Sequence, residues 1–309
     1  AGGRRGWARL VFEGCVVFLA QTTGWGLFRL GAILAGVKNS VKGSGFLLGA
    51  VLLAVFGFVP SVRMMATVLF VILIGVVIGM PSGLPVGRKD AKFSEVFSKN
   101  RNINWLSAAR LFLFGARDVW FVVGIPIYFY AVLSDGSEEG NRTAFFMIGT
   151  FMAVWTILYG IVQGSAPRIL RAASRTDAQI LALAKRWVGL LIIVPAFLAG
   201  LVWLVPEPSN LLTATIVLGL LVFGGIFAVN SALHSFLILS FTDAKRVTMD
   251  VGFYYMANAA GRLVGTVLSG FTYQIGGLPL CLGTAAVMIG LSWLGTSQLK
   301  SPEHYKVAA

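Results

Sequence analysis

Charge is scarce in this 309-residue chain, since Asp, Glu, Lys and Arg make up only 12% of its residues. Soluble domains carry about 25% charged residues, so an ordinary soluble fold is excluded. The two cysteines, Cys15 and Cys281, lie far apart in apolar runs, which excludes a disulfide framework and a cysteine-based metal site. The sequence also lacks P-loop, HExxH, CxxC and GxSxG motifs, so we expect neither an enzyme nor a bound cofactor or metal.

Apolar residues are abundant instead. They make up 57% of the chain, and the mean hydropathy is +0.83. Long apolar runs recur between short polar segments, a pattern typical of helices that cross a bilayer. The sequence therefore predicts an all-α polytopic protein that is integral to the cell membrane, either an inner or a plasma membrane, with the lipid bilayer as its surroundings.

Basic residues outnumber acidic ones by 25 to 12, which gives a formal net charge of +13. In a soluble protein this excess would suggest a nucleic-acid partner. Here we expect none, because Lys and Arg cluster in short segments between apolar runs. Basic segments at 81–105, 168–186 and 245–246 alternate with acidic or uncharged ones. By the positive-inside rule, the basic segments and the C-terminus are predicted to lie in the cytoplasm.

Hydropathy and charge together divide the chain into five segments. A poorly defined N-terminal stretch, interpreted as an interfacial helix or a partial span, is followed by two spans, a basic cytoplasmic linker, a unit of six spans and a cytoplasmic tail. The predicted bounds of these segments are 1–36, 37–80, 81–105, 106–298 and 299–309. The six spans of the fourth segment are predicted at about 106–133, 143–164, 187–205, 210–240, 250–273 and 277–298.

A six-span unit with both ends in the cytoplasm, preceded by a basic linker, is typical of the C-terminal half of a major facilitator transporter. The preceding spans, at about 41–58 and 64–80, are interpreted as the end of the N-terminal half and are predicted to meet at a turn around Pro60 and Arg63. That half would then hold about two to three helices, so we expect a chain that is truncated at its N-terminus.

The predicted span 106–133 carries three formal charges, on Arg110, Arg117 and Asp118. The two arginines are seven residues apart, which returns to nearly the same azimuth on a helix of about 3.6 residues per turn. Each would cost roughly 2.5–3.5 kcal/mol if it faced lipid, so their shared face should look into protein or water. Because neighbouring residues on a helix diverge, we expect the partner of Asp118 to come from another span. The three charges are either functional or a fixed ion-pair network.

Small residues recur every fourth position in the predicted span 250–273, at Ala257, Gly261, Gly265 and Ser269. Small side chains at this spacing allow a second helix to approach closely. We therefore interpret this ridge as a helix-packing surface.

A polar stripe formed by Tyr255, Asn258 and Arg262 runs along a neighbouring face of the same span. A guanidinium group supported by an amide and a phenol can bind an anionic group. Alternatively, Arg262 forms a salt bridge with Asp118. The sequence leaves both interpretations open.

Two further polar pairs lie inside predicted spans or close to one. Asn230 and His234 are one turn apart, and His234 could contact a substrate, carry a proton or form an interhelical hydrogen bond. Lys38 and Lys42 share a helical stripe with the glycines at 45 and 49.

Five stretches together resemble the ArsJ family of major facilitator transporters, and the resemblance extends from about residue 24 to about residue 299. These stretches are VKNSVKGSGFLLGA (37–50), FSKNRNINWLSAARLFLFGARDVWFVVGIPIYFY (97–130), YGIVQGSAPRIL (159–170), FAVNSALHSFLILSF (227–241) and VGFYYMANAAGRLVGTVLSG (251–270). The resemblance implies export of 1-arseno-3-phosphoglycerate, which forms when glyceraldehyde-3-phosphate dehydrogenase uses arsenate in place of phosphate. The alternatives are a major facilitator exporter of another small organic anion, and a truncated membrane subunit that does not transport.

A small, multiply anionic ester calls for cationic groups in a central cavity. We therefore expect Arg117 and Arg262 to bind anionic groups, with Asp118 as the proton-coupling carboxylate. Arg110, Lys42 and Lys38 would add positive potential along the path. The remaining candidate substrate-binding residues are Tyr255, Asn258, Asn230 and His234.

Overall fold

The computed structural model describes residues 27–79, 98–205, 207–242 and 247–301, and every regular element in these ranges is helical. The helices are α2 (Leu27–Phe56), α3 (Phe58–Gly79), α4 (Arg101–Asp118), η3 (Val119–Gly124), α5 (Ile125–Leu133), α6 (Glu138–Ile169), η4 (Ala172–Ser174), α7 (Asp177–Leu204), α8 (Asn210–Phe241) and α9 (Val247–Ser297). Seven helical stretches in the described ranges are long and apolar enough to cross a membrane. This confirms an all-α polytopic membrane protein.

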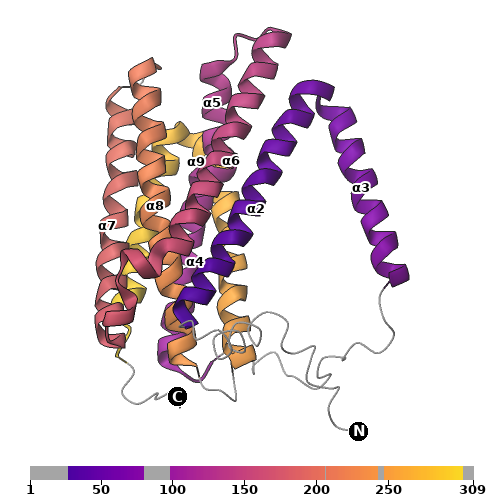
Figure 1. The fold of residues 1–309 in the computed structure, drawn as a ribbon. Coiled ribbons are helices and arrows are strands. Elements are labelled where there is room, and N and C mark those ends of the chain that lie inside the picture. Colours follow the sequence, from indigo (N-terminus) through magenta and orange to yellow (C-terminus); the bar gives the residue numbers. More distant parts are fainter. Residues whose placement is uncertain (1–26, 80–97, 206, 243–246, 302–309) are drawn as a thin grey trace.

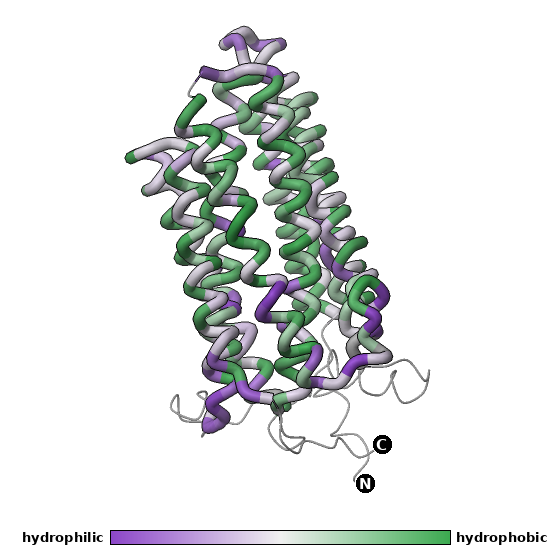
Figure 2. The backbone as a smooth tube through the Cα atoms, turned by 90° about the vertical axis from the view of Figure 1, so that its left-hand side faces the viewer, coloured by the Kyte–Doolittle hydropathy of each residue, from purple (hydrophilic) through white to green (hydrophobic). Residues whose placement is uncertain are grey.

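Helices α4 to α9 form a bundle of roughly parallel and antiparallel helices, with α2 packed along α6 (Figure 1). Helix α3 turns back from α2 and stands apart from the bundle (Figure 1). Ser61 is the buried residue of α3, while its large apolar side chains are exposed. Apolar residues run along the helices and hydrophilic ones gather toward the ends (Figure 2), as expected for helices in lipid.

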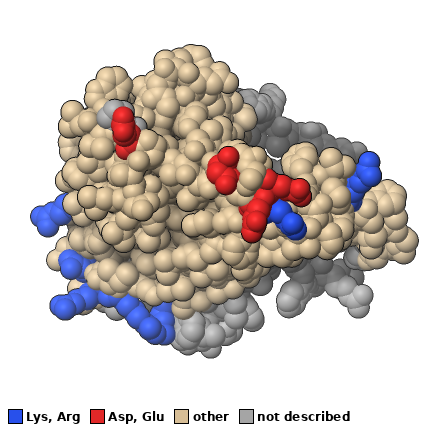
Figure 3. All heavy atoms as spheres, turned by 90° about the horizontal axis from the view of Figure 1, so that it is seen from above, with Lys and Arg blue, Asp and Glu red and all other residues tan. Residues whose placement is uncertain are grey.

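The two ends of the bundle differ in charge. The connections between α5 and α6 and between α7 and α8 lie at one end (Figure 1). The break that Gly276 and Gly277 make inside α9 lies at the same end. Exposed Asp135, Glu138 and Glu139 gather on this end, which is seen from above in Figure 3. The arginine-rich connection between α6 and α7, with Arg168, Arg171 and Arg175, lies at the opposite end, called the basic end below. The alternating signs along the sequence therefore correspond to two chemically distinct ends.

Helix α2 starts at Leu27, well before the boundaries expected at 37 for the segment and at about 41 for the span. Hydropathy misplaced this start because lysines interrupt the apolar run, although Lys is a good helix former. The turn is also corrected: the chain breaks at Gly57, whose φ of +75° suits glycine, and not around Pro60 and Arg63. Pro60 lies in the first turn of α3, where its missing N–H costs no hydrogen bond.

The span predicted at 106–133 is longer and less regular than expected. Helix α4 already begins at Arg101, because the side chain of Asn100 caps it by accepting a 2.9 Å hydrogen bond from the Asn102 N–H. The linker expected at 81–105 therefore ends earlier, and its part at 81–97 lies outside the described residues. The π-helix η3 follows α4, with the Ile125 N–H bonded to the Trp120 carbonyl. Pro126, which cannot donate, explains why the regular ladder is interrupted here.

The remaining spans were predicted with mixed accuracy. Helix α8 lies where the 210–240 span was expected. Helices α6 and α7 extend beyond the predicted apolar runs, because their capped polar ends continue the helix; the first turn of α7 carries a capping box of Thr176 and Gln179. The turn expected between the last two spans is confirmed by the non-helical backbone of Gly276 and Gly277, which divides α9. Within 1–36, residues 1–26 lie outside the described residues.

An aromatic core joins η3, α6 and α8. The Trp120 ring meets the rings of Trp155 and Phe223 edge-on, with ring centroids 5.6 and 5.2 Å apart. The Trp155 indole N–H also donates a 2.8 Å hydrogen bond to the Leu220 carbonyl. This cluster fixes the irregular π segment against its neighbours, because edge-to-face aromatic pairs are directional.

The predicted small-residue ridge packs against α4. A Cβ at Gly261 would overlap the Leu111 carbonyl, and one at Gly265 would overlap the Gly115 carbonyl. Ser269, further along the ridge, accepts a 3.1 Å hydrogen bond from the Gly124 N–H. Close contact between the α4 and α9 backbones is therefore possible only with these small residues.

Helix α2 meets α6 through a second set of small residues. A Cβ at Gly36 would overlap the Gly160 carbonyl, and one at Gly149 would overlap the side chain of Ala50. The glycines at 45 and 49, which the sequence placed on one stripe with the lysines, face open space. The contact face was missed because it is defined by α6, and the sequence of α2 alone does not reveal which face α6 covers.

We predict that Gly265→Ala destabilises the fold by about 1–3 kcal/mol, because the added methyl group must push α9 away from the α4 backbone. The measurement is the thermal unfolding midpoint in detergent. Gly270→Ala is the matched control, since nothing lies within 4 Å of the Cβ position there. Equal midpoints for the two variants would contradict this account of the α4–α9 interface.

Candidate functional site

Asp118 lies at the centre of a charged cluster, which it forms with Arg117, Arg262 and Lys42. Its carboxylate is 1% exposed and accepts hydrogen bonds from the Nε atoms of Arg117, at 2.6 Å, and Arg262, at 3.0 Å. The expected partner from another span is therefore present, because the Arg262 salt bridge forms. The expectation that Arg117 does not pair with its neighbour is wrong. Asp118 is the last α-helical residue, with ψ of −21°, and a long arginine side chain folds back over it where the π segment begins.

Arg110 and Arg117 share one face of α4, as their spacing predicted. Phe114 lies between them, with its ring centroid 3.9 Å from the Arg110 Cζ and 5.1 Å from the Arg117 Cζ. Arg110 also lies 4.9 Å from the Tyr254 ring and donates a 3.2 Å hydrogen bond to the Ser231 carbonyl. Both arginines are buried, so cation–π contacts replace part of their lost hydration.

Helix α2 adds a further cation to the cluster. Lys42 lies within electrostatic range of Arg117, Arg262 and Asp118, and its Nζ is 5.8 Å from the centroid of the Phe46 ring. Arg117, Arg262 and Lys42 are therefore three cations near one carboxylate. Such an excess of positive charge on membrane-spanning helices favours an anionic ligand.

A polar chain crosses the bundle next to Arg110. Asn39 donates a 2.7 Å hydrogen bond to Gln163, whose amide donates a 3.2 Å hydrogen bond to the Ser231 hydroxyl. This chain links α2, α6 and α8, and the Ser231 carbonyl extends it to Arg110 on α4. Sequence reasoning missed Asn39, because a single Asn near the lysines gave no signal of its own.

Asn230 and His234 are fully buried on α8 beside Ser231. Among the described residues, neither ring nitrogen of His234 has a hydrogen-bond partner, and neither does the Asn230 Oδ1. Buried polar groups are normally hydrogen-bonded, and the Asn230 Nδ2 does donate a 3.1 Å hydrogen bond to the Ile226 carbonyl. The substrate, proton and structural interpretations of His234 all stay predictions.

The polar stripe on α9 is less buried than the rest of the cluster. The side chain of Arg262 is 48% exposed, and Tyr255 is also exposed. Asn258 is half-buried, and its Oδ1 has no hydrogen-bond partner among the described residues. Lys38 is exposed on α2, one turn from Lys42. The predicted site residues therefore fall into a buried group on α4 and α8 and a more accessible group on α2 and α9.

Comparisons with protein-family models, with curated proteins and with solved structures found no match. Within the described ranges, no three His, Cys, Asp or Glu side chains come together in a way that could hold a metal ion. The structure thus defines the class of the protein, an all-helical polytopic membrane protein with basic residues around a buried carboxylate.

We predict that Asp118→Asn destabilises the protein by about 3–5 kcal/mol, because it leaves the buried Arg117 without its counter-charge. Arg262→Gln should cost less, since that arginine is half-exposed. The measurement is the free energy of unfolding in detergent micelles.

Glu139→Gln is the control for this prediction, because it removes an exposed carboxylate in the first turn of α6. Its expected effect is within about 1 kcal/mol. If Asp118→Asn costs no more than Glu139→Gln, the Asp118 carboxylate does not hold the cluster together.

Proposed function

We propose that the protein is a membrane transporter that exports a small organic anion by alternating access. The observation that carries this proposal is the charge of the site: three cations, Arg117, Arg262 and Lys42, lie near the single buried carboxylate of Asp118. A purely structural network would be expected to balance its charges, because unpaired buried charge is costly. A multiply anionic substrate would supply the missing negative charge.

The arrangement suits an anion that bridges two arginines. Asp118 contacts Arg262 through Nε, the guanidinium nitrogen nearest the backbone, so the terminal nitrogens extend beyond this contact. Guanidinium groups bind phosphate-like oxygens in pairs, through parallel N–H donors. Arg117 and Arg262, held side by side by one carboxylate, are the proposed substrate-binding pair. Arg110, Lys42 and Lys38 provide the surrounding positive potential.

One feature of the fold supports a major facilitator scaffold with two halves. Helix α2, which the sequence assigns to the N-terminal half, packs closely along α6, which it assigns to the C-terminal half.

The π-helix η3 directly follows Asp118, and π segments in helices often occur at functional sites. A change in the pairing of Asp118 could therefore alter the geometry of this span, with Asp118 as the proposed proton-coupling group.

The proposed substrate is 1-arseno-3-phosphoglycerate, as the resemblance to the ArsJ family implies. Its phosphate and arsenate groups are the kind of ligand that paired guanidinium groups recognise. The dehydrogenase that forms the ester would be a functional partner in the cytosol. The proposed location is the inner or plasma membrane, with the basic end and the C-terminus in the cytoplasm.

We predict that Arg117→Ala and Arg262→Ala each lower export of 1-arseno-3-phosphoglycerate by about tenfold or more, because each removes a charge-assisted hydrogen bond to the substrate. The measurement is arsenate resistance in a sensitive bacterial strain that supplies the dehydrogenase. The wild-type 309-residue chain is tested beside a version extended with the preceding spans of an ArsJ-family transporter, and the variants are made in the version that protects.

Arg63→Ala on α3 is the matched control, since this arginine is exposed and lies outside the cluster. Resistance that survives Arg117→Ala or Arg262→Ala at normal membrane expression would contradict the binding roles. If neither the 309-residue chain nor its extended version protects without substitutions, despite verified membrane insertion, the proposed arsenical substrate is wrong. Export of another anion, or a subunit that does not transport, would then be the better interpretation.

A further inference from the structure

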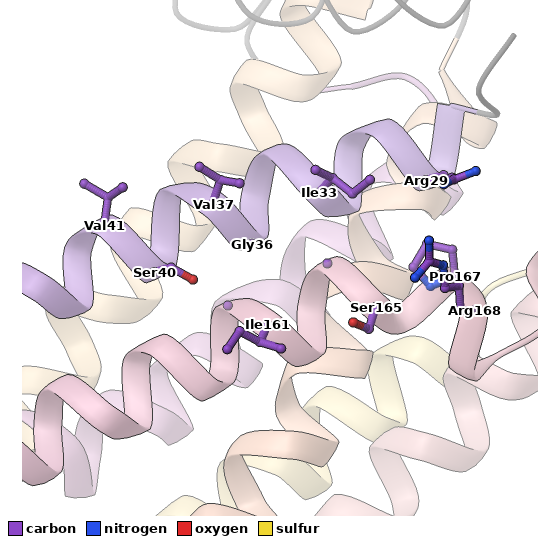
Figure 4. A pocket seen from close by; sticks show the side chains of 12 residues that line it. Arg29, Ile33, Gly36, Val37, Ser40, Val41, Ile161, Ser165, Pro167 and Arg168 are labelled. Carbon is purple, nitrogen blue, oxygen red and sulfur yellow. The ribbon is translucent and has the colours of Figure 1, made fainter. Parts of the chain in front are cut away.

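A groove runs between α2 and α6. Its volume is about 360 Å³. Figure 4 shows the two helices side by side, with Arg29 and Arg168 at one end of the groove and mainly apolar side chains, together with Ser40 and Ser165, along the rest. It is lined by Arg29, Ile33, Gly36, Val37, Ser40, Val41, Gly160, Ile161, Gly164, Ser165, Pro167 and Arg168.

The lining of the groove is polarised along its length. Arg29 lies near the start of α2 and Arg168 near the end of α6, so both guanidinium groups belong to the basic end of the bundle. Further along, Val37 and Ile161 are more than half exposed on the outer surface of the two helices. Gly36 and Gly160 lie in this lining at the point where the two helices touch. The groove therefore combines a cationic end with an apolar channel that faces outward.

The length of the groove matches half of a bilayer. From Arg29 to Val41 the lining follows α2 for roughly 18 Å, at about 1.5 Å per residue. One leaflet of the hydrocarbon core is roughly 15 Å thick. The cationic end therefore lies at the level of a headgroup when the apolar part lies among acyl chains.

We propose that this groove binds an anionic phospholipid, with its phosphate on Arg29 and Arg168 and an acyl chain along Val37, Val41 and Ile161. A soluble anion would have no use for the apolar length of the groove, and an uncharged lipid would not use its arginines. Basic pockets between membrane helices on the cytoplasmic side bind anionic headgroups in this way. The lipid would bridge α2 and α6 and reinforce their contact. This site is separate from the charged cluster and does not depend on the proposed transport activity.

The test is native mass spectrometry of the full chain in detergent, titrated with phosphatidylglycerol, phosphatidylcholine or glycerol phosphate. Phosphatidylglycerol should bind more tightly than phosphatidylcholine. Arg29→Gln and Arg168→Gln should each weaken phosphatidylglycerol binding roughly fivefold, since each removes one cation near the headgroup. Arg168→Lys should retain most of the binding, because it keeps the charge.

Arg186→Gln is the matched control, as it removes an exposed charge of α7 outside the groove, and should leave binding unchanged. Three results would overturn the proposal. The first is equal binding of the two phospholipids. The second is tight binding of glycerol phosphate, which would indicate a phosphate site without a lipid chain. The third is equal weakening by Arg186→Gln, which would indicate diffuse attraction by the basic end.

Discussion

The pairing of the Asp118 carboxylate with Arg117 and Arg262 is the interaction on which the charged site depends. In an apolar bundle an arginine without a counter-charge is costly, and one carboxylate here serves two of them. Asp118 also ends the regular part of α4, where the backbone changes to the π-helix η3. Electrostatics and backbone geometry are thus joined at one residue.

Close helix packing makes this pairing possible. Gly261 and Gly265 bring the α9 backbone against α4, and Arg262, which follows Gly261, reaches across to Asp118. On the other side, Gly36 and Gly160 bring α2 against α6. This second contact adds Lys42 to the cluster and Asn39 to the polar chain. Larger residues at these interfaces would separate the helices that carry the charges.

The bundle also separates its polar groups by depth. The carboxylate of Asp118 is buried, with Arg117 buried beside it, whereas the groove with Arg29 and Arg168 opens outward at the basic end. A buried cation needs a defined partner, while a cation near a headgroup can be satisfied by lipid or water. The same residue type therefore has different proposed roles at the two sites.

The sequence by itself determined the features that depend on composition and local periodicity. Hydropathy located α8, and the glycine pair at 276 and 277 marked the break in α9. Helical spacing placed Arg110 and Arg117 on one face and identified the small-residue ridge of α9, because both follow from the turn of a single helix.

Only the tertiary structure decided which helices meet and how side chains bend at irregular points. The start of α2, the π-helix, and the Arg117–Asp118 pair were missed or wrongly predicted. So was the face of α2 that meets α6, because it depends on the neighbouring helix and not on the segment itself. Local sequence fixes the direction of a Cβ atom, but the partner that a side chain reaches depends on the distance between helices, which the packing of the whole bundle sets.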